Sequence, residues 1–327
     1  MSVGREILLK DNGRFCEPAL AAVVADALGV EPRGISLRPI STGLFNTSFY
    51  VNGPARPLVL RIAPPDDPSR LLFYEYRMMR QEPRLHELIR SRTSAPVAEI
   101  VAHGLDAPGI ERDFLLMERL EGAPISDHPS ISSRELSNVL RQVGECLKEV
   151  HRIKGDRYGY VGPHRPMEPQ ADWPAAFRIM WNKLIDDVER SNGYTREQAD
   201  HLRRLFDAHA KAFDRPVAAS LLHMDVWAQN ILAARGRLTG LVDWDRALWG
   251  DPEIEFAVLD YCGISRPAFW VGYGSPRDEG PEAEIRRIFY LLYELQKYIF
   301  IHRVRNGNAA SANGYRGECL RLAAQLK

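Results

Sequence analysis

The apolar pattern of this chain changes near residue 121, and that change limits the folds it can adopt. Before it, β-rich runs near 35–40, 47–52 and 57–62 are separated by Ser-Thr-Gly and Asn-Gly-Pro turns. After it, apolar residues recur at steps of three and four, as on one face of an α-helix. The first such face is formed by Leu136, Leu140, Val143, Leu147 and Val150. Strands in one part and helices in the other predict an α+β architecture.

Further elements complete two regions. Residues 15–29 read as a short opening helix, 70–91 as a charged helix-prone stretch, and Ile100–His103 and Phe114–Met117 as two more strands. Later helices are expected near 172–188, 195–213, 251–260, 281–303 and 308–326. We therefore predict a small β-rich lobe over 1–118 and a larger, mainly helical lobe over 119–327. A hinge is expected at Glu118–Pro124, and a cleft between lobes is where small ligands tend to bind.

Composition excludes several classes of protein. Lys plus Arg equals Asp plus Glu, 43 against 43, so no overall charge attracts nucleic acid. The first residues lack the pattern of a secretory signal, and no run approaches the roughly 20 apolar residues of a membrane span. The four cysteines are scattered, which favours buried thiols over disulfides or zinc. We expect a cytoplasmic monomer or homodimer with no membrane or nucleic-acid partner.

The segment from residue 221 to residue 245 carries the chemistry. Apolar runs at 231–234 and 238–242 flank an Arg-Gly turn and predict a β-hairpin. Its ends would bring Asn230 and Asp243 side by side although they are 13 residues apart, and Asp225 lies five residues before Asn230. Two carboxylates and an amide oxygen are ligands that Mg²⁺ prefers. The alternative is that the first two are turn residues and Asp243 a strand-end cap.

The same spacing matches the catalytic loop of protein kinases, which is His-x-Asp, four residues, Asn, and later a metal-binding Asp. In that template the first Asp accepts the proton of the attacking hydroxyl. The Asn and the later Asp hold the metal ions. We assign His223 a structural role, in which it fixes the shape of the loop around Asp225 rather than transferring protons.

The sequence from His223 to Asn230, with Leu238–Asp245 and Gly250–Pro252, resembles the aminoglycoside phosphotransferase family. The resemblance extends upstream to Thr93–Val97 and Phe114–Gly122 and spans roughly residues 35 to 260. It implies a bilobal protein-kinase-like fold and transfer of the γ-phosphoryl group of ATP to a hydroxyl of a small molecule. It also implies that Asp225 is the catalytic base and that Asn230 and Asp243 are the Mg²⁺ ligands.

The resemblance further implies a nucleotide site in the first lobe. Arg61 stands where protein kinases have Lys, and it would grip phosphate oxygens; the alternative is a surface arginine at a strand end. Its partner would be Glu82, preferred over Glu75. The phosphate-covering loop would lie over 41–48, and the adenine-binding hinge near residue 118. The cofactor-binding residues expected there are Ser41, Thr42, Gly43, Asn46, Ser48, Glu118 and Leu120.

The acceptor end is less defined. Met224 stands where the family most often has Gly. Trp227 either lines the acceptor pocket or packs under the loop, and Asp245 either touches a metal or the acceptor or caps the helix near residue 251. Asp260 is a further candidate. Residues 261–327 contain ten Lys/Arg against six Asp/Glu and many aromatics, mostly expected in the core, which leaves room for a less charged acceptor such as a sugar, nucleoside or peptide-like natural product.

We therefore expect an ATP- and Mg²⁺-dependent small-molecule kinase acting on an aminoglycoside or other antibiotic or natural product. The alternatives are a kinase of a primary metabolite, of choline, homoserine or amino-sugar type, and a catalytically silent nucleotide-binding protein. A protein kinase is disfavoured, because only seven residues separate Asp243 from the Gly-Asp-Pro turn, too few for an activation segment.

Overall fold

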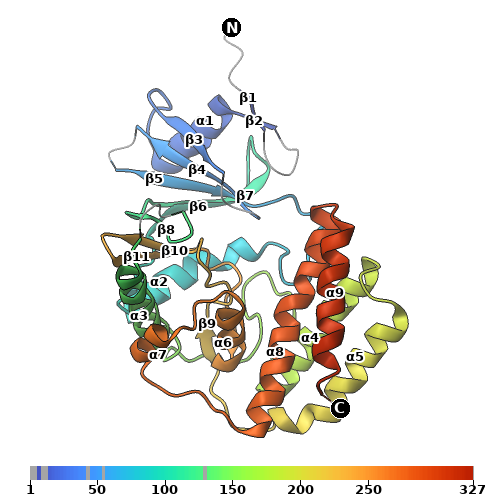
Figure 1. The fold of residues 1–327 in the computed structure, drawn as a ribbon. Helices are drawn as coiled ribbons and strands as arrows, with labels where there is room; N and C mark the ends of the chain where they lie inside the picture. The colour runs from blue at the N-terminus through green and yellow to red at the C-terminus, as the bar shows by residue number, and fades with distance from the viewer. Residues whose placement is uncertain (1–5, 9–13, 42–44, 54–55, 128–130, 327) are drawn as a thin grey trace.

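The computed structural model of this chain describes residues 6–8, 14–41, 45–53, 56–127 and 131–326. The strand-rich and helix-rich parts of the sequence form two lobes, one above the other in Figure 1. In the first lobe a five-stranded antiparallel sheet has the order β3-β4-β5-β7-β6. Its strands are β3 (Ser36–Ile40), β4 (Thr47–Asn52), β5 (Leu58–Ile62), β6 (Ile100–Ala107) and β7 (Arg112–Glu118). The three expected strand runs and the two later ones are thus confirmed.

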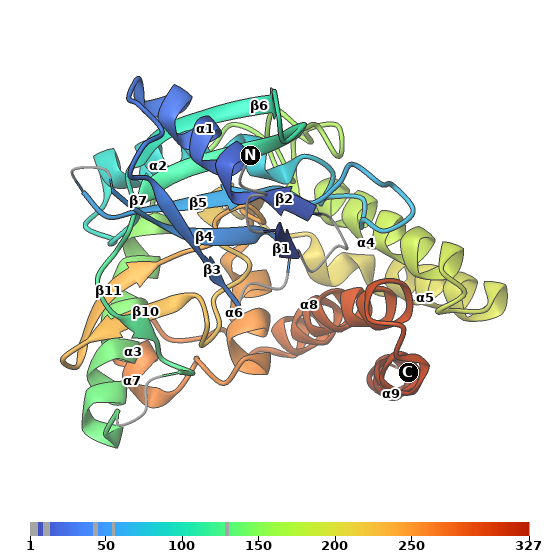
Figure 2. The same ribbon diagram turned by 90° about the horizontal axis from the view of Figure 1, so that it is seen from above.

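The two faces of this sheet have different roles. Helix α1 (Glu17–Leu28), which follows a small β1–β2 hairpin (Glu6–Leu8 and Arg14–Cys16), packs on one face. Because successive side chains of a strand point to opposite faces, Leu58, Leu60 and Ile62 of β5 join this apolar core. Helix α1 lies over the sheet on this face (Figure 2). The residue between the last two, Arg61, points to the other face, where it contacts Asp243 of the second lobe.

The helix expected over 70–91 forms only in its second half. The chain turns without a helix until η1 (Met78–Gln81), and α2 (Glu82–Arg92) follows. The carboxylate of Glu75 accepts a hydrogen bond from the backbone of Leu72 and forms an ion pair with Arg305, far along the chain. These tertiary contacts hold the segment in a turn that its local helix propensity does not favour.

The second lobe is helical around an aromatic core. Its helices are α3 (Ser133–Val150), α4 (Trp173–Arg190), α5 (Arg196–His209), η2 (Ala210–Phe213), α6 (Pro252–Tyr261), α7 (Pro267–Tyr273), α8 (Pro281–Phe300) and α9 (Ala309–Ala323). Short α7 was not predicted, and α8 ends in a π-helical turn, η3 (Ile301–Arg305), rather than as a regular helix to residue 303. Phe289, Tyr290 and Tyr293 are buried, so the core interpretation of these aromatics is confirmed.

Short paired strands fix the ends of the connecting loops of this lobe. The predicted hairpin forms as β10 (Ile231–Ala234) and β11 (Arg237–Leu241), and β8 (Ala123–Pro124) pairs with β10. A second pair joins β9 (Ser220–Leu222) to β12 (Leu248–Gly250). The two pairs bracket the segment from residue 223 to residue 230 and hold its ends in place.

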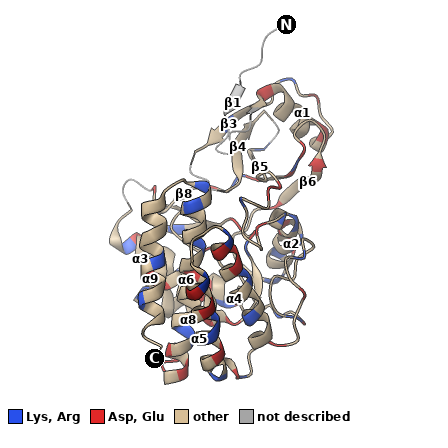
Figure 3. Ribbon diagram, turned by 90° about the vertical axis from the view of Figure 1, so that its right-hand side faces the viewer, with Lys and Arg blue, Asp and Glu red and all other residues tan. Residues whose placement is uncertain are grey.

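The surface carries both signs of charge. Lys and Arg lie interspersed with Asp and Glu over the helices on the side shown in Figure 3. Within the described residues, no helix combines the length and the apolar character needed to cross a membrane.

Candidate active site

A cavity of about 960 Å³ lies between the sheet of the first lobe and the hairpin and helices of the second. Most of the residues singled out from the sequence line it. These are Ser41, Ser48, Arg61, Glu118, Leu120, Asp225, Trp227, Asn230, Asp243 and Asp245. Residues more than 180 positions apart in the chain thus meet at one cavity.

The hairpin brings Asn230 and Asp243 together as expected. The backbone N–H of Val242 donates to the carbonyl of Asn230 at 3.0 Å, immediately beside Asp243. The side-chain amide nitrogen of Asn230 donates to Asp225, at 2.8 Å to Oδ2 and 2.9 Å to the carbonyl oxygen. Because the amide is planar, these bonds turn its Oδ1 away from Asp225. Asp225, Asn230 and Asp243 all line the same cavity.

His223 lies where a structural brace would lie. It is fully buried and contacts the ring of Trp244, with ring centroids 4.2 Å apart. Its Nδ1 accepts the N–H of Asp225 at 3.3 Å, so Nε2 carries the proton and donates to the carbonyl of Val242 at 3.1 Å. The imidazole thus links the two chain segments that contain Asp225 and Asp243.

The backbone of Met224 has a conformation that favours glycine. Its φ is +66°, in the left-handed region that glycine enters without steric cost. Here the strained peptide is held on both sides, because its N–H donates to Glu255 at 2.6 Å and its carbonyl accepts from Arg246 at 2.8 Å. His151 in turn binds Glu255 at 2.6 Å, which anchors the loop to α3 and α6.

Arg61 connects the two lobes. Its Nη1 donates to both oxygens of Glu82, at 2.9 and 2.7 Å, while its Nη2 contacts Asp243 and lies 3.4 Å from Asp245. Glu75, the other candidate partner, pairs instead with Arg305. Burial opposes ionisation of Glu82, but Arg61 and His86 together outweigh it, and the pKa of this carboxyl is lowered.

Three carboxylates gather at this point, since one oxygen each of Glu82, Asp243 and Asp245 lies within 4.8 Å of the others. Asp245 also accepts a hydrogen bond from Asn46 Nδ2 at 2.8 Å. Burial, with repulsion from Asp243 and Glu82, raises the pKa of Asp245 well above its ordinary value. A divalent cation relieves such repulsion, and hard oxygen donors are the ligands that Mg²⁺ prefers. The residues present therefore fit a magnesium site.

An unsatisfied polar atom also supports a magnesium site at this point. Asn46 Oδ1 is buried and has no hydrogen-bond partner among the described residues, although its Nδ2 is bonded. The alternative role of Asp245 as a helix cap is wrong, because Asp251 caps α6 by accepting the N–H of Glu253 at 3.1 Å. Asp245 thus remains with the carboxylate cluster.

The structure adds Lys297 of α8, which sequence reasoning missed. Its Nζ lies 2.6 Å from Glu294 Oε1 and 3.8 Å from Asp225 Oδ1. The Asp225 side chain is 28% exposed; burial in the cavity raises its pKa, and the charge of Lys297 opposes that rise. Helical spacing groups residues 294, 297 and 301 on one face. It does not tell which face of α8 meets the cavity.

Some predicted residues are not brought to the cavity. Asp260 forms an ion pair with Arg277 at 2.7 Å and binds Ser265, and it is not among the lining residues, so its expected contact with the acceptor has no support here. Thr42 and Gly43 lie outside the described residues.

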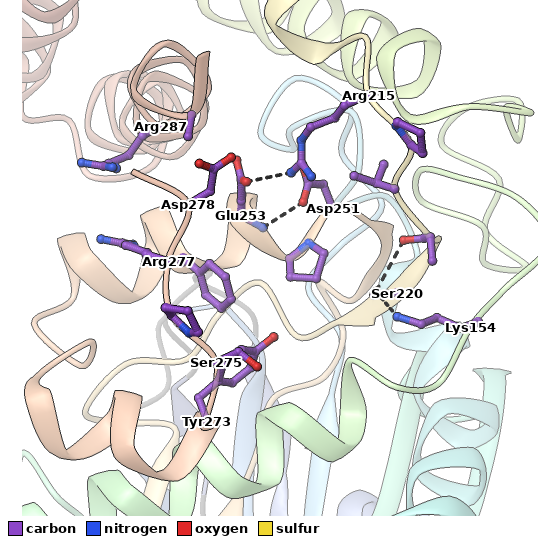
Figure 4. A pocket seen from close by; sticks show the side chains of 17 residues that line it. Lys154, Arg215, Ser220, Asp251, Glu253, Tyr273, Ser275, Arg277, Asp278 and Arg287 are labelled. Carbon is purple, nitrogen blue, oxygen red and sulfur yellow. Dashed lines mark hydrogen bonds and ion pairs between the residues drawn. The ribbon is translucent and has the colours of Figure 1, made fainter. Parts of the chain in front are cut away.

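A second hollow of about 400 Å³ lies near the beginning of α6 (Figure 4). Within it, Arg215 pairs with Asp251 at 2.6 Å and with Glu253 at 2.8 Å. None of the residues predicted for the site lines it. The cavity between the lobes is therefore the candidate active site.

Comparison with known proteins agrees with this geometry. The chain is 24% identical over 173 residues to hygromycin-B 4-O-kinase of Escherichia coli, covering 50% of this chain and 46% of that protein. It is 26% identical over 174 residues to viomycin phosphotransferase of Streptomyces vinaceus, covering 51% of this chain and 55% of that protein. The chain thus spans about half the length of the curated relatives it matches.

Solved structures show the fold. A putative fructosamine-3-kinase from Haemophilus somnus 129PT has a TM-score of 0.67 at 20% identity, covering 94% of this chain and 96% of that one. A thermostable mutant of the aminoglycoside phosphotransferase APH(4)-Ia, in ternary complex with AMP-PNP and hygromycin B, has a TM-score of 0.65 at 20% identity, covering 94% and 98%. The bilobal protein-kinase-like fold predicted from the sequence is confirmed.

A family model described as the phosphotransferase enzyme family matches residues 36–284, from the first strand of the sheet to the beginning of α8. The match covers well over half of the chain and contains the whole loop from His223 to Asp243. The resemblance to aminoglycoside phosphotransferases is thereby confirmed, and the chain belongs to the phosphotransferase enzyme family.

Proposed function

We propose that this protein transfers the γ-phosphoryl group of ATP to a hydroxyl group of a small molecule. The observation that carries the proposal is the meeting of Asp225, Asn230, Asp243 and Arg61 in one cavity, with the buried Glu82 paired to Arg61. This set supplies a base, metal ligands and a phosphate-binding cation, which are the parts that phosphoryl transfer requires.

Asp225 is the base. As the acceptor oxygen bonds to the γ-phosphorus and the bond to the β–γ bridging oxygen breaks, ADP leaves and the hydroxyl proton passes to Asp225. The bond from Asn230 to Oδ2 orients this carboxylate and leaves Oδ1 for the acceptor. Lys297, 3.8 Å from Oδ1, favours its ionised form, in which it can accept a proton.

Asn230 and Asp243, with Asp245 beside them, hold Mg²⁺, which neutralises charge on the phosphates when bound. Arg61 contacts Asp243 already and has a planar guanidinium suited to phosphate oxygens. It is held in place by Glu82, so it needs little reorganisation when nucleotide binds.

The hinge end of the cavity takes the adenine. Glu118 and Leu120 border it, and apolar side chains from both lobes, Val59 above and Leu232 below, offer the walls of a flat slot. Ser41 and Ser48, on either side of the loop between β3 and β4, supply hydroxyls for the phosphates. We also propose that the lobes divide at residues 118 and 119, where β7 ends, and that the protein is a cytoplasmic monomer or homodimer.

The acceptor is proposed to be an antibiotic or another natural product. The printed names of two relatives, a hygromycin-B kinase and a viomycin phosphotransferase, support this choice over a primary metabolite. A protein substrate is disfavoured, because β12 and α6 follow the metal-binding segment almost at once.

The test is a screen for ADP release with the full chain and Mg-ATP over aminoglycosides, peptide antibiotics, nucleosides, amino sugars and amino alcohols. A hit is verified by a gain of one phosphoryl group in the mass of the acceptor. Asp225→Ala should bind ATP as the wild type does and lose transfer by a factor of about 10²–10⁴. Unchanged turnover in that variant excludes Asp225 as the base.

A further inference from the structure

Behind the catalytic loop, a chain of hydrogen bonds connects α7 to the peptide that precedes Asp225. The hydroxyl of Tyr273 in α7 lies 2.9 Å from Nδ1 of His151, and Nε2 of His151 lies 2.6 Å from Glu255 Oε2. The other oxygen of Glu255 accepts the N–H of Met224 at 2.6 Å. Tyr273 also lines the second hollow (Figure 4), so the chain of bonds runs from that hollow to the loop.

We infer that Tyr273 is a positioning residue, which acts through His151 and Glu255 on the Met224 peptide and so on the base Asp225. The inference rests on the proposed function for the role of Asp225. Tyr273 does not line the cavity between the lobes, so it reaches the chemistry only through the residues in between. Three features carry the inference: the strain of the loop, the protonation of the imidazole and the docking of α7.

The peptide at Met224 has to be held in its conformation. Its φ of +66° is costly for a residue with a side chain, and such strain persists only where the surrounding bonds over-determine it. The N–H of Met224 has Glu255 as its acceptor, and Glu255 is completely buried. The position of this carboxylate therefore decides where the peptide lies, and with it the next residue, Asp225.

The carboxylate of Glu255 depends in turn on His151. Burial opposes its ionisation, but the hydrogen bond and the charge of His151 oppose burial. With smaller contributions from His223 and Met224, the pKa of this carboxyl is lowered. A buried carboxylate that loses one of its donors bears the cost of its lost hydration. His151 must therefore present a proton on Nε2.

Tyr273 selects that protonation state. In a neutral imidazole one nitrogen donates and the other accepts, and the bond made by one nitrogen fixes the role of the other. The tyrosine O–H makes Nδ1 of His151 the acceptor, so the proton lies on Nε2, opposite Glu255. Burial and the charges of Glu255 and Asp251 raise the pKa of Tyr273, so its hydroxyl keeps the proton that it donates. Without this hydroxyl, the imidazole proton is free to move to Nδ1, which leaves an unprotonated Nε2 facing the carboxylate.

The docking of α7 on α3 fixes where the hydroxyl lies. The ring of Tyr273 packs edge-on to Phe256 with centroids 5.2 Å apart, and it stacks on Phe269 at 5.8 Å. The two helices approach at Gly144, where an added Cβ would lie 2.7 Å from the backbone nitrogen of Tyr273. His151 directly follows the last residue of α3, so the same helix contact sets both ends of the Tyr273–His151 bond.

Hydrogen exchange tests the inference without an acceptor. Mass spectrometry follows the backbone amides of residues 221–230 and of α5 in the full chain. Tyr273→Phe should speed exchange of 221–230 roughly three- to tenfold, the effect of one lost hydrogen bond, and leave α5 unchanged. The matched control is Tyr315→Phe in α9, which removes a hydroxyl bond of 2.7 Å to Tyr261 and should exchange like the wild type in 221–230. Unchanged exchange in Tyr273→Phe, or the same acceleration in α5, overturns the inference.

Variants of His151 test the route of the effect. The side-chain amide of Gln places a donor where Nε2 lies, whereas that of Asn places one where Nδ1 lies. His151→Gln should therefore keep residues 221–230 protected, and His151→Asn should loosen them at least as much as Tyr273→Phe does. In the His151→Gln background, adding Tyr273→Phe should change exchange less than roughly twofold. An effect as large as in the wild type would show that Tyr273 does not act through His151.

The single substitution at Tyr273 decides the case if the variants of the buried His151 fail to fold. Kinetics with an acceptor found by the ADP-release screen give a second readout. Tyr273→Phe should lower kcat roughly three- to tenfold and leave the KM for ATP unchanged, because the base is displaced while the proposed nucleotide-binding residues lie outside the chain of bonds. A raised KM with an unchanged kcat contradicts the positioning role.

Failure of this inference can be told from failure of the proposed function. If Asp225→Ala leaves turnover unchanged while Tyr273→Phe loosens residues 221–230, the proposed function fails, and with it the effect of Tyr273 on the base. If transfer depends on Asp225 but exchange of the loop is insensitive to Tyr273, the proposed function stands and the positioning role is wrong.

Discussion

Arg61 illustrates how much one residue decides in this site. It leaves the sheet on the face opposite α1, and its guanidinium is shared between Glu82 of α2 and the carboxylates of the second lobe. Burial disfavours its charge, yet the neighbouring carboxylates outweigh burial and raise its pKa above the ordinary value. Because Glu82 is completely buried, its negative charge depends on Arg61 and on His86, whose Nε2 lies 3.3 Å away.

Removing one partner of this pair should therefore be costly. We expect Glu82→Ala to lower the free energy of unfolding by about 3 kcal/mol, since it leaves the buried Arg61 with fewer partners. Urea unfolding followed by circular dichroism measures the loss. The control is Glu99→Ala, which breaks the ion pair between Glu99 and Arg56. The side chains of these two residues are 46% and 47% exposed, respectively. That change should cost much less stability, because an exposed ion pair is screened by water. Equal losses in the two variants would contradict a structural role for the buried pair.

Among the elements, α3 and α7 approach each other through two glycines. A Cβ added at Gly144 of α3 would overlap the carbonyl oxygen of Phe269, and one added at Gly272 of α7 would overlap that of Arg141. The absence of side chains lets the two backbones pack closely. This contact carries α7 against the α3 helix that anchors the catalytic loop through His151 and Glu255.

Filling that contact should separate the helices. Gly144→Ala is expected to destabilise the protein by about 1–3 kcal/mol, the range typical of overpacking. The matched control is Gly314→Ala in α9, where an added Cβ meets nothing within 4 Å. That substitution should stabilise by roughly 0.5–1 kcal/mol, because alanine is the better helix former. Thermal unfolding of both variants measures the two opposite changes in stability. A stabilised Gly144→Ala variant would contradict the close approach of α3 and α7.

The last turn of α4 contains a buried side chain with a shifted pKa, Asp187. Burial raises the pKa of Asp187 to about 6, even though Phe73 N–H donates to it at 2.6 Å and Arg190 lies 2.7 Å away. Its charge also faces the negative, carbonyl end of the helix dipole. The folded protein therefore holds this proton more tightly than the unfolded chain, whose aspartates titrate near about 3.9.

This difference predicts a pH dependence of stability with a definite sign. The contribution of Asp187 is fully present below about pH 4 and is lost as the pH rises through about 6, by up to about 3 kcal/mol. Asp187→Asn cannot titrate but keeps an oxygen for Phe73. The difference in unfolding free energy between wild type and variant, measured from pH 4 to pH 7, should therefore shift in favour of the variant. A constant difference would show that Asp187 has an ordinary pKa.

At the scale of the whole molecule, contacts between described residues join the two lobes at the cavity. Asn46 binds Asp245, Arg61 binds Asp243, and Glu75 binds Arg305. Each joins the first lobe to the second, and each lies at the rim or floor of the candidate active site. Ligands bound there should consequently affect the stability of both lobes together.

Ligand removal tests that coupling. With Mg²⁺ and AMP-PNP at about 100 times the dissociation constant, binding should add about 2.7 kcal/mol to the free energy of unfolding. EDTA should remove most of this gain in the wild type, because nucleotide without metal leaves its charge opposite Asp243. In Asp243→Asn the gain should be small with or without metal, whereas Asp207→Asn, an exposed side chain of α5, should behave as the wild type. A gain that is insensitive to EDTA would argue against the metal site.

Much of the candidate site could be predicted from the sequence because its parts are local. Eight residues contain His223, the left-handed Met224, Asp225 and Asn230. Two short apolar runs indicate the hairpin that returns to Asp243. Short-range hydrogen bonds and turns decide such geometry, so spacing alone predicts it. The alternation of β5 likewise indicates that Arg61 leaves the face opposite the apolar core.

The rest depended on packing between distant segments. Glu75 lies in a region of helical propensity, but its bond to Arg305, 230 residues away, holds it in a turn. Lys297 reaches Asp225 only because α8 packs with that face against the catalytic loop. The sequence by itself determined the sheet strands of the first lobe, most helices and the loop from His223 to Asp243, since these follow from local periodicity and spacing. Only the tertiary structure decided which charged side chains meet Asp225 in the cavity, because they come from helices whose orientation is set by the core around them.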